Sequence, residues 1–143
     1  MLCSSGDTET LTFFVNWVKE ASPVRPAVLM TDRDNAQIAA LRTVHPDSPV
    51  YLCIWHVLKA MRSHLVIKEF DTLWKKVISW VKTDNFFEFV KLWHEIRNDP
   101  SNPQSFVSYL ESNWLPVCDM WSRAARKGRT IYEEGDTNML IEA

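Results

Sequence analysis

Two short apolar runs, residues 27–30 and 50–53, place the strongest constraint on how this chain can fold. The first run stops at an acidic turn that contains Asp32, and the second leads through Cys53 into His56. A stretch with helical spacing separates them, so the pattern predicts a right-handed strand–helix–strand unit of an α/β fold. In open α/β sheets, loops at the carboxyl ends of the strands converge on a crevice. We therefore expect Asp32 and His56 to lie at such an edge.

The acidic turn holds two carboxylates, and the sequence predicts a different role for each. Asp34 is placed to cap the helix that follows, with Gln37 three residues later to complete a capping box. Asp32, at the end of the first strand, is left without such a structural role. The alternative is that Asp32 only caps the next helix or accepts hydrogen bonds from turn amides.

Helical spacing dominates the rest of the chain. Residues 1–5 resemble the end of a strand, and a helix is predicted over residues 7–21. From residue 54 to about residue 128 the pattern is helical throughout, with a bend or break expected at Pro116. The positions predicted to be buried are Leu11, Phe14, Val15, Val18, Trp55, Leu58, Met61, Leu65, Phe70, Leu73, Trp74, Val77, Ile78, Val81, Phe86, Val90, Trp93, Ile96, Phe106, Leu110, Trp114, Val117 and Trp121.

Composition excludes several classes of protein. A chain of 143 residues with 46% apolar and 24% charged residues is typical of about one globular domain. No apolar run approaches the ~18 residues that a membrane span needs. Three cysteines at irregular positions indicate a reducing intracellular compartment. The net charge of −2 gives no global attraction to nucleic acid, and only three glycines leave no phosphate loop for an ordinary α/β enzyme on a small substrate.

Cys53 and His56 form a C-x-x-H pair, which has the spacing of half a zinc site. Structural zinc needs four ligands, and the sequence has no second pair, because Cys118 and His94 are isolated on helical stripes. The simpler interpretation is a buried cysteine in a strand and a histidine at a helix start. We therefore expect no zinc.

Four residues near the end of the chain form a local basic cluster: Arg123, Arg126, Lys127 and Arg129. They are candidate phosphate contacts, and the alternative is a solvated, flexible segment. Trp80 lies off the predicted stripe of its helix, so it is the candidate for an exposed ring that stacks on a nucleobase. Core packing is favoured for the tryptophans on the stripes.

Two separated segments resemble a known family. The segment TDRDNAQIAALRTVHPDSPVYLCIWHVLKAM resembles the region around the second catalytic aspartate of Mutator-like element (MULE) transposases. There, a strand-end Asp, a helix, a proline turn and a strand closing in C-x-x-H occur in that order. GDTNMLIEA is similar to the motif that carries the family's third catalytic acid. The resemblance covers essentially the whole chain.

The resemblance implies a partial ribonuclease H-like (DDE transposase) core with an all-helical insertion. The implied parts are an α/β core over residues 1–67, the insertion over 68–128, and the start of the core helix with the third acid over 129–143. Asp32 matches the second acid and Glu142 the third.

The implied chemistry is metal-dependent DNA cleavage and strand transfer in DNA transposition. Asp32 and Glu142 would be ligands of Mg²⁺ or Mn²⁺, and Cys53 and His56 match the family's C-x-x-H near the active site. Carboxylates are hard ligands that suit these ions, and a pair of ions can activate the attacking oxygen and stabilise the leaving one. Transposon ends as the DNA partner, the nucleus as the location, homo-oligomers of the full-length protein and no membrane partner are further implications.

The sequence departs from the family pattern at the first acid. That aspartate would lie on a strand before Met1, and Asp7, at a helix start, cannot replace it. Two of three ligands should hold a metal poorly, so we expect an incomplete and inactive fragment. The alternative is a non-catalytic, transposase-derived protein that binds nucleic acid or regulates.

Overall fold

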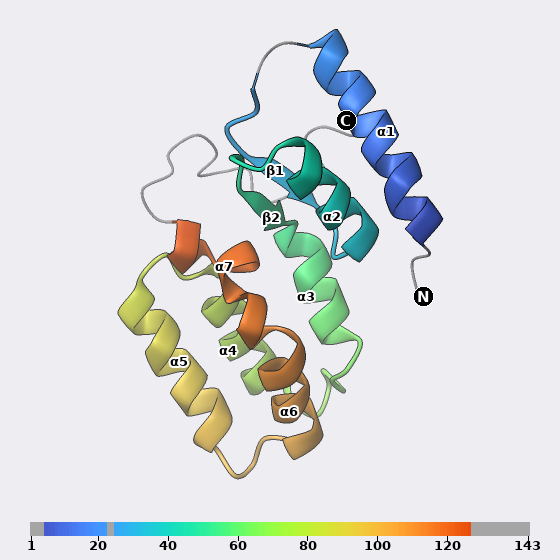
Figure 1. The fold of residues 1–143 in the computed structure, drawn as a ribbon. Coiled ribbons are helices and arrows are strands. Elements are labelled where there is room, and N and C mark those ends of the chain that lie inside the picture. The colour runs from blue at the N-terminus through green and yellow to red at the C-terminus, as the bar shows by residue number, and fades with distance from the viewer. Residues whose placement is uncertain (1–4, 23–24, 127–143) are drawn as a thin grey trace. The chain divides into compact units, whose positions relative to one another are not determined.

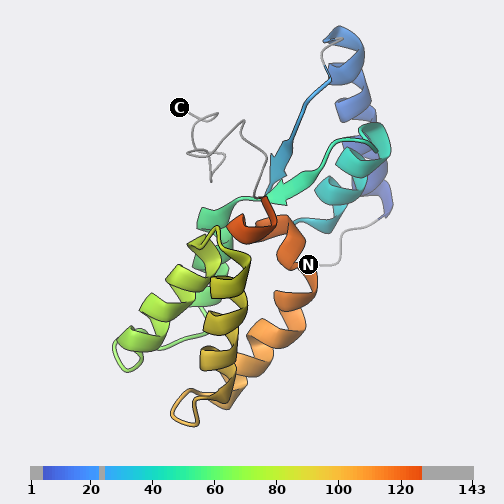
Figure 2. The same cartoon turned by 90° about the vertical axis from the view of Figure 1, so that its left-hand side faces the viewer.

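The computed structural model describes residues 5–22 and 25–126, which fall into two compact units (Figures 1 and 2). The α/β unit contains the residues up to Cys53, and the helical unit begins at Ile54. Within these described residues, no helix is long and apolar enough to cross a membrane. The domain boundaries expected from the sequence, after residues 67 and 128, stay predictions. The strand expected over residues 1–5 falls mostly outside the described residues, although Ser5 already belongs to a helix.

The α/β unit has the predicted strand–helix–strand arrangement. Strand β1 (Leu29–Thr31) pairs in parallel with β2 (Val50–Leu52), and α2 (Asn35–Val44) connects them. All three residues of β2 are buried. The described part of the chain is therefore mostly helical with one small two-stranded parallel sheet (Figure 1).

The N-terminus of α2 confirms one half of the predicted capping box. The Asp34 carboxylate accepts hydrogen bonds from the backbone N–H of Ala36 at 2.9 Å and of Gln37 at 3.1 Å, as an N-cap should. The other half is wrong. The Gln37 side chain accepts from the Thr31 hydroxyl, and the Asp34 N–H donates to the carbonyl of Asp32 at 2.8 Å. Gln37 therefore joins the helix to the end of β1 instead of closing the cap.

Helix α1 (Ser5–Ala21) packs against α2, but its predicted buried stripe is only partly correct. Leu11 and Val15 are half-buried, whereas Phe14 is 57% exposed and Val18 is 44% exposed. A helix of 17 residues that packs on one helix of 10 residues covers only a narrow face. The remaining apolar positions of α1 stay exposed.

The helical unit contains short helices joined by short loops (Figure 2). Its elements are α3 (Ile54–Arg62), α4 (Asp71–Lys82), α5 (Phe86–Asn98), α6 (Gln104–Asn113), the 3₁₀ turn η1 (Leu115–Val117), α7 (Cys118–Trp121) and the 3₁₀ turn η2 (Arg123–Arg126). The break expected at Pro116 is confirmed, because this residue lies in η1 between α6 and α7.

Trp80 is at the centre of this unit, and the expectation that its ring is exposed is wrong. Its side chain is fully buried. Its ring stacks on Phe89 and Trp93, with centroids 5.3 and 5.1 Å away, and meets Trp121 edge-on at 4.9 Å. The physical reason is the orientation of α4, which buries position 80 together with Leu73, Val77 and Val81.

The buried face of α5 also differs in part from the predicted one. Trp93 and Ile96 are buried as expected, but Phe86 and Val90 are 62% and 37% exposed. Phe89 takes their place in the core, where it contacts the Trp80 ring. Each helix therefore buries part of its predicted stripe together with one aromatic residue that the prediction left out, Trp80 on α4 and Phe89 on α5.

Candidate functional site

Asp32 lies directly after β1, as the sequence predicted. The backbone N–H of Cys53 donates to the carbonyl oxygen of Thr31 at 3.0 Å, so the parallel pairing continues to the last residue of each strand. Asp32 and Cys53 therefore follow neighbouring strands at the same edge of the sheet. Asp32 is half-buried and Cys53 is fully buried.

The turn after β1 gives its two carboxylates different surroundings. Asp34 is occupied by the N-cap of α2, while the Asp32 carbonyl accepts the Asp34 N–H at 2.8 Å. The hydroxyl of Thr31, which is buried, donates to Gln37 one turn into α2. These contacts fix the backbone on both sides of Asp32. They also agree with the predicted division of roles, in which Asp34 is structural.

The C-x-x-H pair divides between the two units. Cys53 ends the α/β unit, and His56 lies in the first turn of α3, where its ring meets Trp55 edge-on at a centroid distance of 4.7 Å. The helix-start position predicted for His56 is therefore observed. The expectation of no zinc at this pair stays a prediction.

A divalent metal needs more ligands than the described residues bring together. Among residues 5–22 and 25–126, no group of three or more His, Cys, Asp or Glu side chains could hold a metal ion. Of the two acids matched to the family, Asp32 is described, and Glu142 lies outside the described residues. A single carboxylate does not by itself make a Mg²⁺ or Mn²⁺ site.

The basic cluster is described only in part. Arg123 and Arg126 belong to η2, and Arg123 is half-buried, whereas Lys127 and Arg129 lie outside the described residues. Their role as phosphate contacts stays a prediction. Trp80 has to be removed from the candidate DNA contacts because its buried ring cannot stack on a base.

A second aromatic candidate, missed from the sequence, lies on α3. Trp55 was expected in the core but is 44% exposed, and Lys59 Nζ lies 4.8 Å from the centroid of its ring. Arg62 is exposed on the same side of the helix, seven residues after Trp55. We call Trp55, Lys59 and Arg62 the α3 basic face.

A different choice of stripe would have revealed the α3 basic face. The observed buried residues of α3 are Ile54, Val57 and Met61. Their spacings of three and four are as good as those of the predicted stripe, which began at Trp55. The apolar spacing of Ile54, Val57 and Met61 was the signal available for the observed register.

The comparisons with known proteins support the resemblance found in the sequence. Residues 1–60 match the MULE transposase domain. The predicted recognition is confirmed. Asp32, Cys53 and His56 lie within the MULE match, whereas Glu142 and the basic cluster lie beyond it.

One curated relative extends the similarity further along the chain. Protein FAR1-RELATED SEQUENCE 4 of Arabidopsis thaliana is 27% identical over 120 residues. The aligned part is 83% of this chain but only 14% of the relative, so the chain spans a small part of that protein. No solved structure matches the chain.

Proposed function

We propose that the chain is a DNA-binding MULE-type transposase domain in which Asp32 belongs to the catalytic site. The observation that supports this most is the position of Asp32. It directly follows β1 of a parallel strand–helix–strand unit, inside the segment that matches the MULE transposase domain. The carboxyl ends of parallel strands are where catalytic groups collect in α/β sheets. The sheet would then be part of a ribonuclease H-like core, and the helical unit would contain the insertion.

In this proposal Asp32 supplies one carboxylate to a Mg²⁺ or Mn²⁺ site and Glu142 supplies another. The metal would contribute Lewis-acid chemistry to DNA cleavage and strand transfer at transposon ends. The contribution of this chain's described residues is positional. The Cys53–Thr31 hydrogen bond and the Asp34 cap hold the turn that carries Asp32. The family resemblance also implies a nuclear location and homo-oligomers of the full-length protein.

The α3 basic face supplies a second candidate DNA contact besides the basic cluster at Arg123. An exposed indole can stack on an unpaired base, while Lys59 and Arg62 are placed on the same side to contact phosphates. Lys59 Nζ lies over one face of the Trp55 ring, so a base would stack on the opposite face. Together with Arg123 and its neighbours, this face would bind DNA without base-specific readout.

A non-catalytic DNA-binding or regulatory protein is the second candidate. The observation that favours it is the α3 basic face, an exposed ring with two cationic side chains on the same side of one helix. DNA binding through that face does not require Asp32. The two candidates therefore differ in what substitution of Asp32 does.

The first experiment measures binding of a labelled single strand and of a duplex by fluorescence anisotropy at several salt concentrations. Trp55→Ala should weaken binding to the single strand by ~1–3 kcal/mol, the cost of losing a stacked base. Replacing both Lys59 and Arg62 by Gln should remove two phosphate contacts. The slope of log K for duplex binding against log salt concentration should then become shallower by about 1.8. Trp17→Ala and Lys91→Gln are matched controls at exposed positions on other helices and should have no effect.

The second experiment separates the two candidates. The chain is incubated with labelled transposon-end DNA and Mn²⁺, alone and joined to the adjoining sequence of its gene. Cleavage abolished by Asp32→Asn, with DNA binding unchanged, would support the transposase. Binding without cleavage in both forms would favour the non-catalytic protein, and absence of DNA binding would contradict both.

A further inference from the structure

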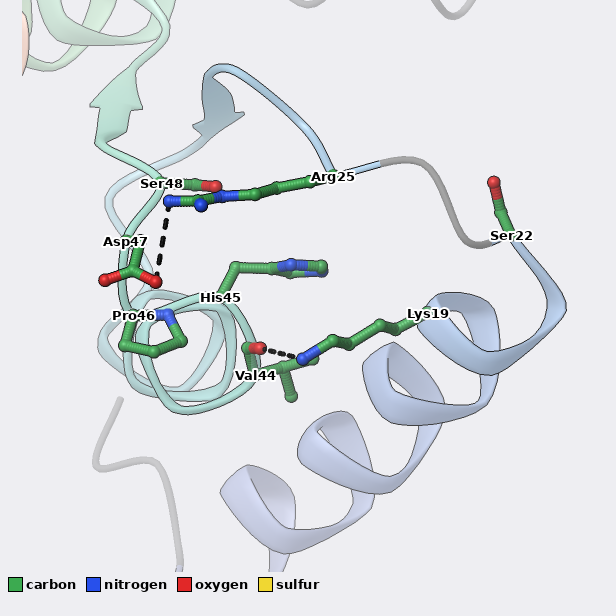
Figure 3. Close-up of a pocket in the computed structure, with 8 residues that line it drawn as sticks. All are labelled: Lys19, Ser22, Arg25, Val44, His45, Pro46, Asp47 and Ser48. Atoms are coloured by element: carbon green, nitrogen blue, oxygen red, sulfur yellow. Dashed lines mark hydrogen bonds and ion pairs between the residues drawn. The ribbon is translucent and has the colours of Figure 1, made fainter.

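A basic pocket lies in the α/β unit, away from the candidate site (Figure 3). It has a volume of about 220 Å³ and is formed by the end of α1, the chain before β1 and the turn between α2 and β2. Its lining residues are Lys19, Ser22, Arg25, Val44, His45, Pro46, Asp47 and Ser48. All belong to one unit, so the pocket is defined by that unit alone.

Three basic side chains line this pocket, two of them in contacts that the structure defines. In Figure 3, the His45 ring lies between the side chains of Arg25 and Lys19. The Lys19 ammonium donates one hydrogen bond to the Val44 carbonyl at 2.9 Å, which fixes its position at the C-terminus of α2 and leaves two further N–H groups. Arg25 pairs with Asp47 at 3.5 Å, and both of these side chains are mostly exposed.

Two hydrogen bonds hold the chain next to the basic residues of the pocket. The Ser48 hydroxyl donates to the carbonyl of Pro26 at 2.6 Å, and the Leu29 N–H donates to the carbonyl of Pro49 at 2.9 Å. These bonds join the turn after α2 to the chain entering β1. The backbone under His45 and Asp47 is therefore held in place before any ligand arrives.

The charges inside the pocket are unbalanced. Lys19 and Arg25 contribute two positive charges and Asp47 one negative charge, and protonation of His45 adds a third positive charge. Partial burial, followed by the nearby charges of Lys19 and then Arg25, lowers the pKa of His45 below its usual value. A bound anion would offset the positive charges of Lys19 and Arg25 and would favour the protonated imidazole of His45.

We propose that this pocket binds a phosphate-type oxyanion, held by Lys19, Arg25 and His45. Charge-assisted N–H···O bonds from an ammonium, a guanidinium and an imidazolium suit a tetrahedral anion with several acceptor oxygens. The same chemistry is offered by free inorganic phosphate and by a phosphodiester of DNA. Asp47 competes with the anion for Arg25, so it is an antagonist of binding.

The position of the pocket makes it independent of the proposed transposase function. Its residues precede β1 and β2, whereas Asp32 follows β1. Because the two strands are parallel, their starts share one edge of the sheet and their ends share the opposite edge. The oxyanion pocket and Asp32 are therefore at opposite edges, and either can exist without the other.

The test uses NMR of the complete 143-residue chain, following the His45 ring and backbone amides during titration with inorganic phosphate against chloride at equal ionic strength. Phosphate should shift the pocket signals more than chloride does. Arg25→Gln should weaken binding about tenfold, the effect of losing one charge-assisted bond. Asp47→Asn should strengthen binding. Lys91→Gln removes the same charge from an exposed position on α5 and should leave phosphate binding unchanged.

A pH arm uses sulfate, whose charge does not change where histidine titrates. Sulfate binding should weaken as the pH rises through the pKa of His45, because the imidazolium is lost while Lys19, Arg25 and Asp47 keep their charges. A third arm uses a short DNA duplex. Shifts of the pocket signals by phosphate and by duplex identify the DNA backbone as a source of the anion, and shifts by phosphate alone identify a free-anion site.

Three results would overturn the proposal. These are no response of His45 to any of the anions, the same affinity in the Arg25→Gln and parent chains, and weaker binding in Asp47→Asn. Lys19→Gln can also release the C-terminus of α2, so circular dichroism accompanies each variant. The exposed Arg25 and Asp47 variants decide the result if Lys19→Gln does not fold.

Discussion

The backbone N–H of Cys53 donates to the carbonyl oxygen of Thr31 over 3.0 Å, at the point where β1 and β2 end. Asp32, which carries the candidate catalytic carboxylate, is the next residue after Thr31. This bond therefore holds the peptide group that leads into the turn. The Thr31 hydroxyl extends the same connection into α2 by donating to the Gln37 side chain. Strand end, turn and helix start are thus joined at one residue.

Thr31→Val should destabilise the α/β unit by about 1 kcal/mol. The change keeps the shape of a buried side chain but removes its hydrogen bond to Gln37. Thr43→Val is the matched control, because the Thr43 hydroxyl is exposed and donates only to the Ala39 carbonyl within α2. Urea unfolding measures both. Equal destabilisation by the two changes would contradict a special role for Thr31.

Asp34→Ala should cost about 1 kcal/mol of unfolding free energy through the lost N-cap of α2. The Asp34 carboxylate accepts from two backbone N–H groups, at 2.9 and 3.1 Å, and alanine leaves both without this partner. Asp34→Asn keeps an acceptor oxygen and should retain most of the stability. Hydrogen exchange of the Ala36 and Gln37 amides reports the effect locally. Unchanged exchange rates in Asp34→Ala would show that the cap contributes nothing.

The strand–helix–strand unit could be predicted from the sequence because its signals are local. An apolar run ends at Asp32, a capping residue follows at Asp34, and two prolines interrupt the chain before β2. Each signal acts within a few residues, so no tertiary information was needed. The family resemblance added the proposed catalytic role of Asp32, which position alone does not give.

The core of the helical unit could not be predicted as well, because it depends on which face of each helix meets its neighbours. The α4 sequence contains two overlapping apolar stripes, one with Trp74 and one with Trp80, and only packing against Phe89, Trp93 and Trp121 selects the second. The same ambiguity on α3 concealed the exposure of Trp55. The oxyanion pocket was also missed, since Lys19 and His45 are distant in sequence.

Trp80→Ala should destabilise the helical unit by ~3–5 kcal/mol, the range for removing a large buried aromatic ring. Trp80→Phe should cost much less, because it keeps an aromatic ring and removes an indole N–H that has no hydrogen-bond partner among the described residues. Trp17→Ala deletes a ring that is 59% exposed and is the control. Thermal unfolding measures all three. A Trp80→Ala variant as stable as the control would refute the aromatic core.

Cys118 should react slowly with iodoacetamide at neutral pH. Burial, and then the neighbouring Asp119 carboxylate, raise the pKa of its thiol, and the thiolate is the reactive form. Asp119→Asn removes the second cause and should speed alkylation. Cys53 is fully buried and should react only on unfolding. Mass spectrometry of digested protein follows the two sites separately. Faster labelling of Cys53 than of Cys118 would contradict the structure.

The loop after α5 should lose local order in acid because of Asp99. Its carboxylate accepts from the hydroxyl of Ser101 at 2.6 Å and from the backbone N–H of Ser101 at 2.9 Å, and these bonds hold the pKa of Asp99 below its usual value of 3.8. A carboxyl group whose pKa is lowered by folding stabilises the folded form above its unfolded pKa. That contribution disappears as the pH falls through the folded pKa.

Ser101→Ala isolates the larger cause of this shift, because it removes the hydroxyl and keeps the backbone N–H. The pKa of Asp99 should rise in the variant without reaching 3.8, since one of the two bonds remains. Carboxyl-carbon NMR titration of the parent and the variant measures this change. An Asp99 titration that is the same in both proteins would mean that the Ser101 hydroxyl does not bond to the carboxylate in solution.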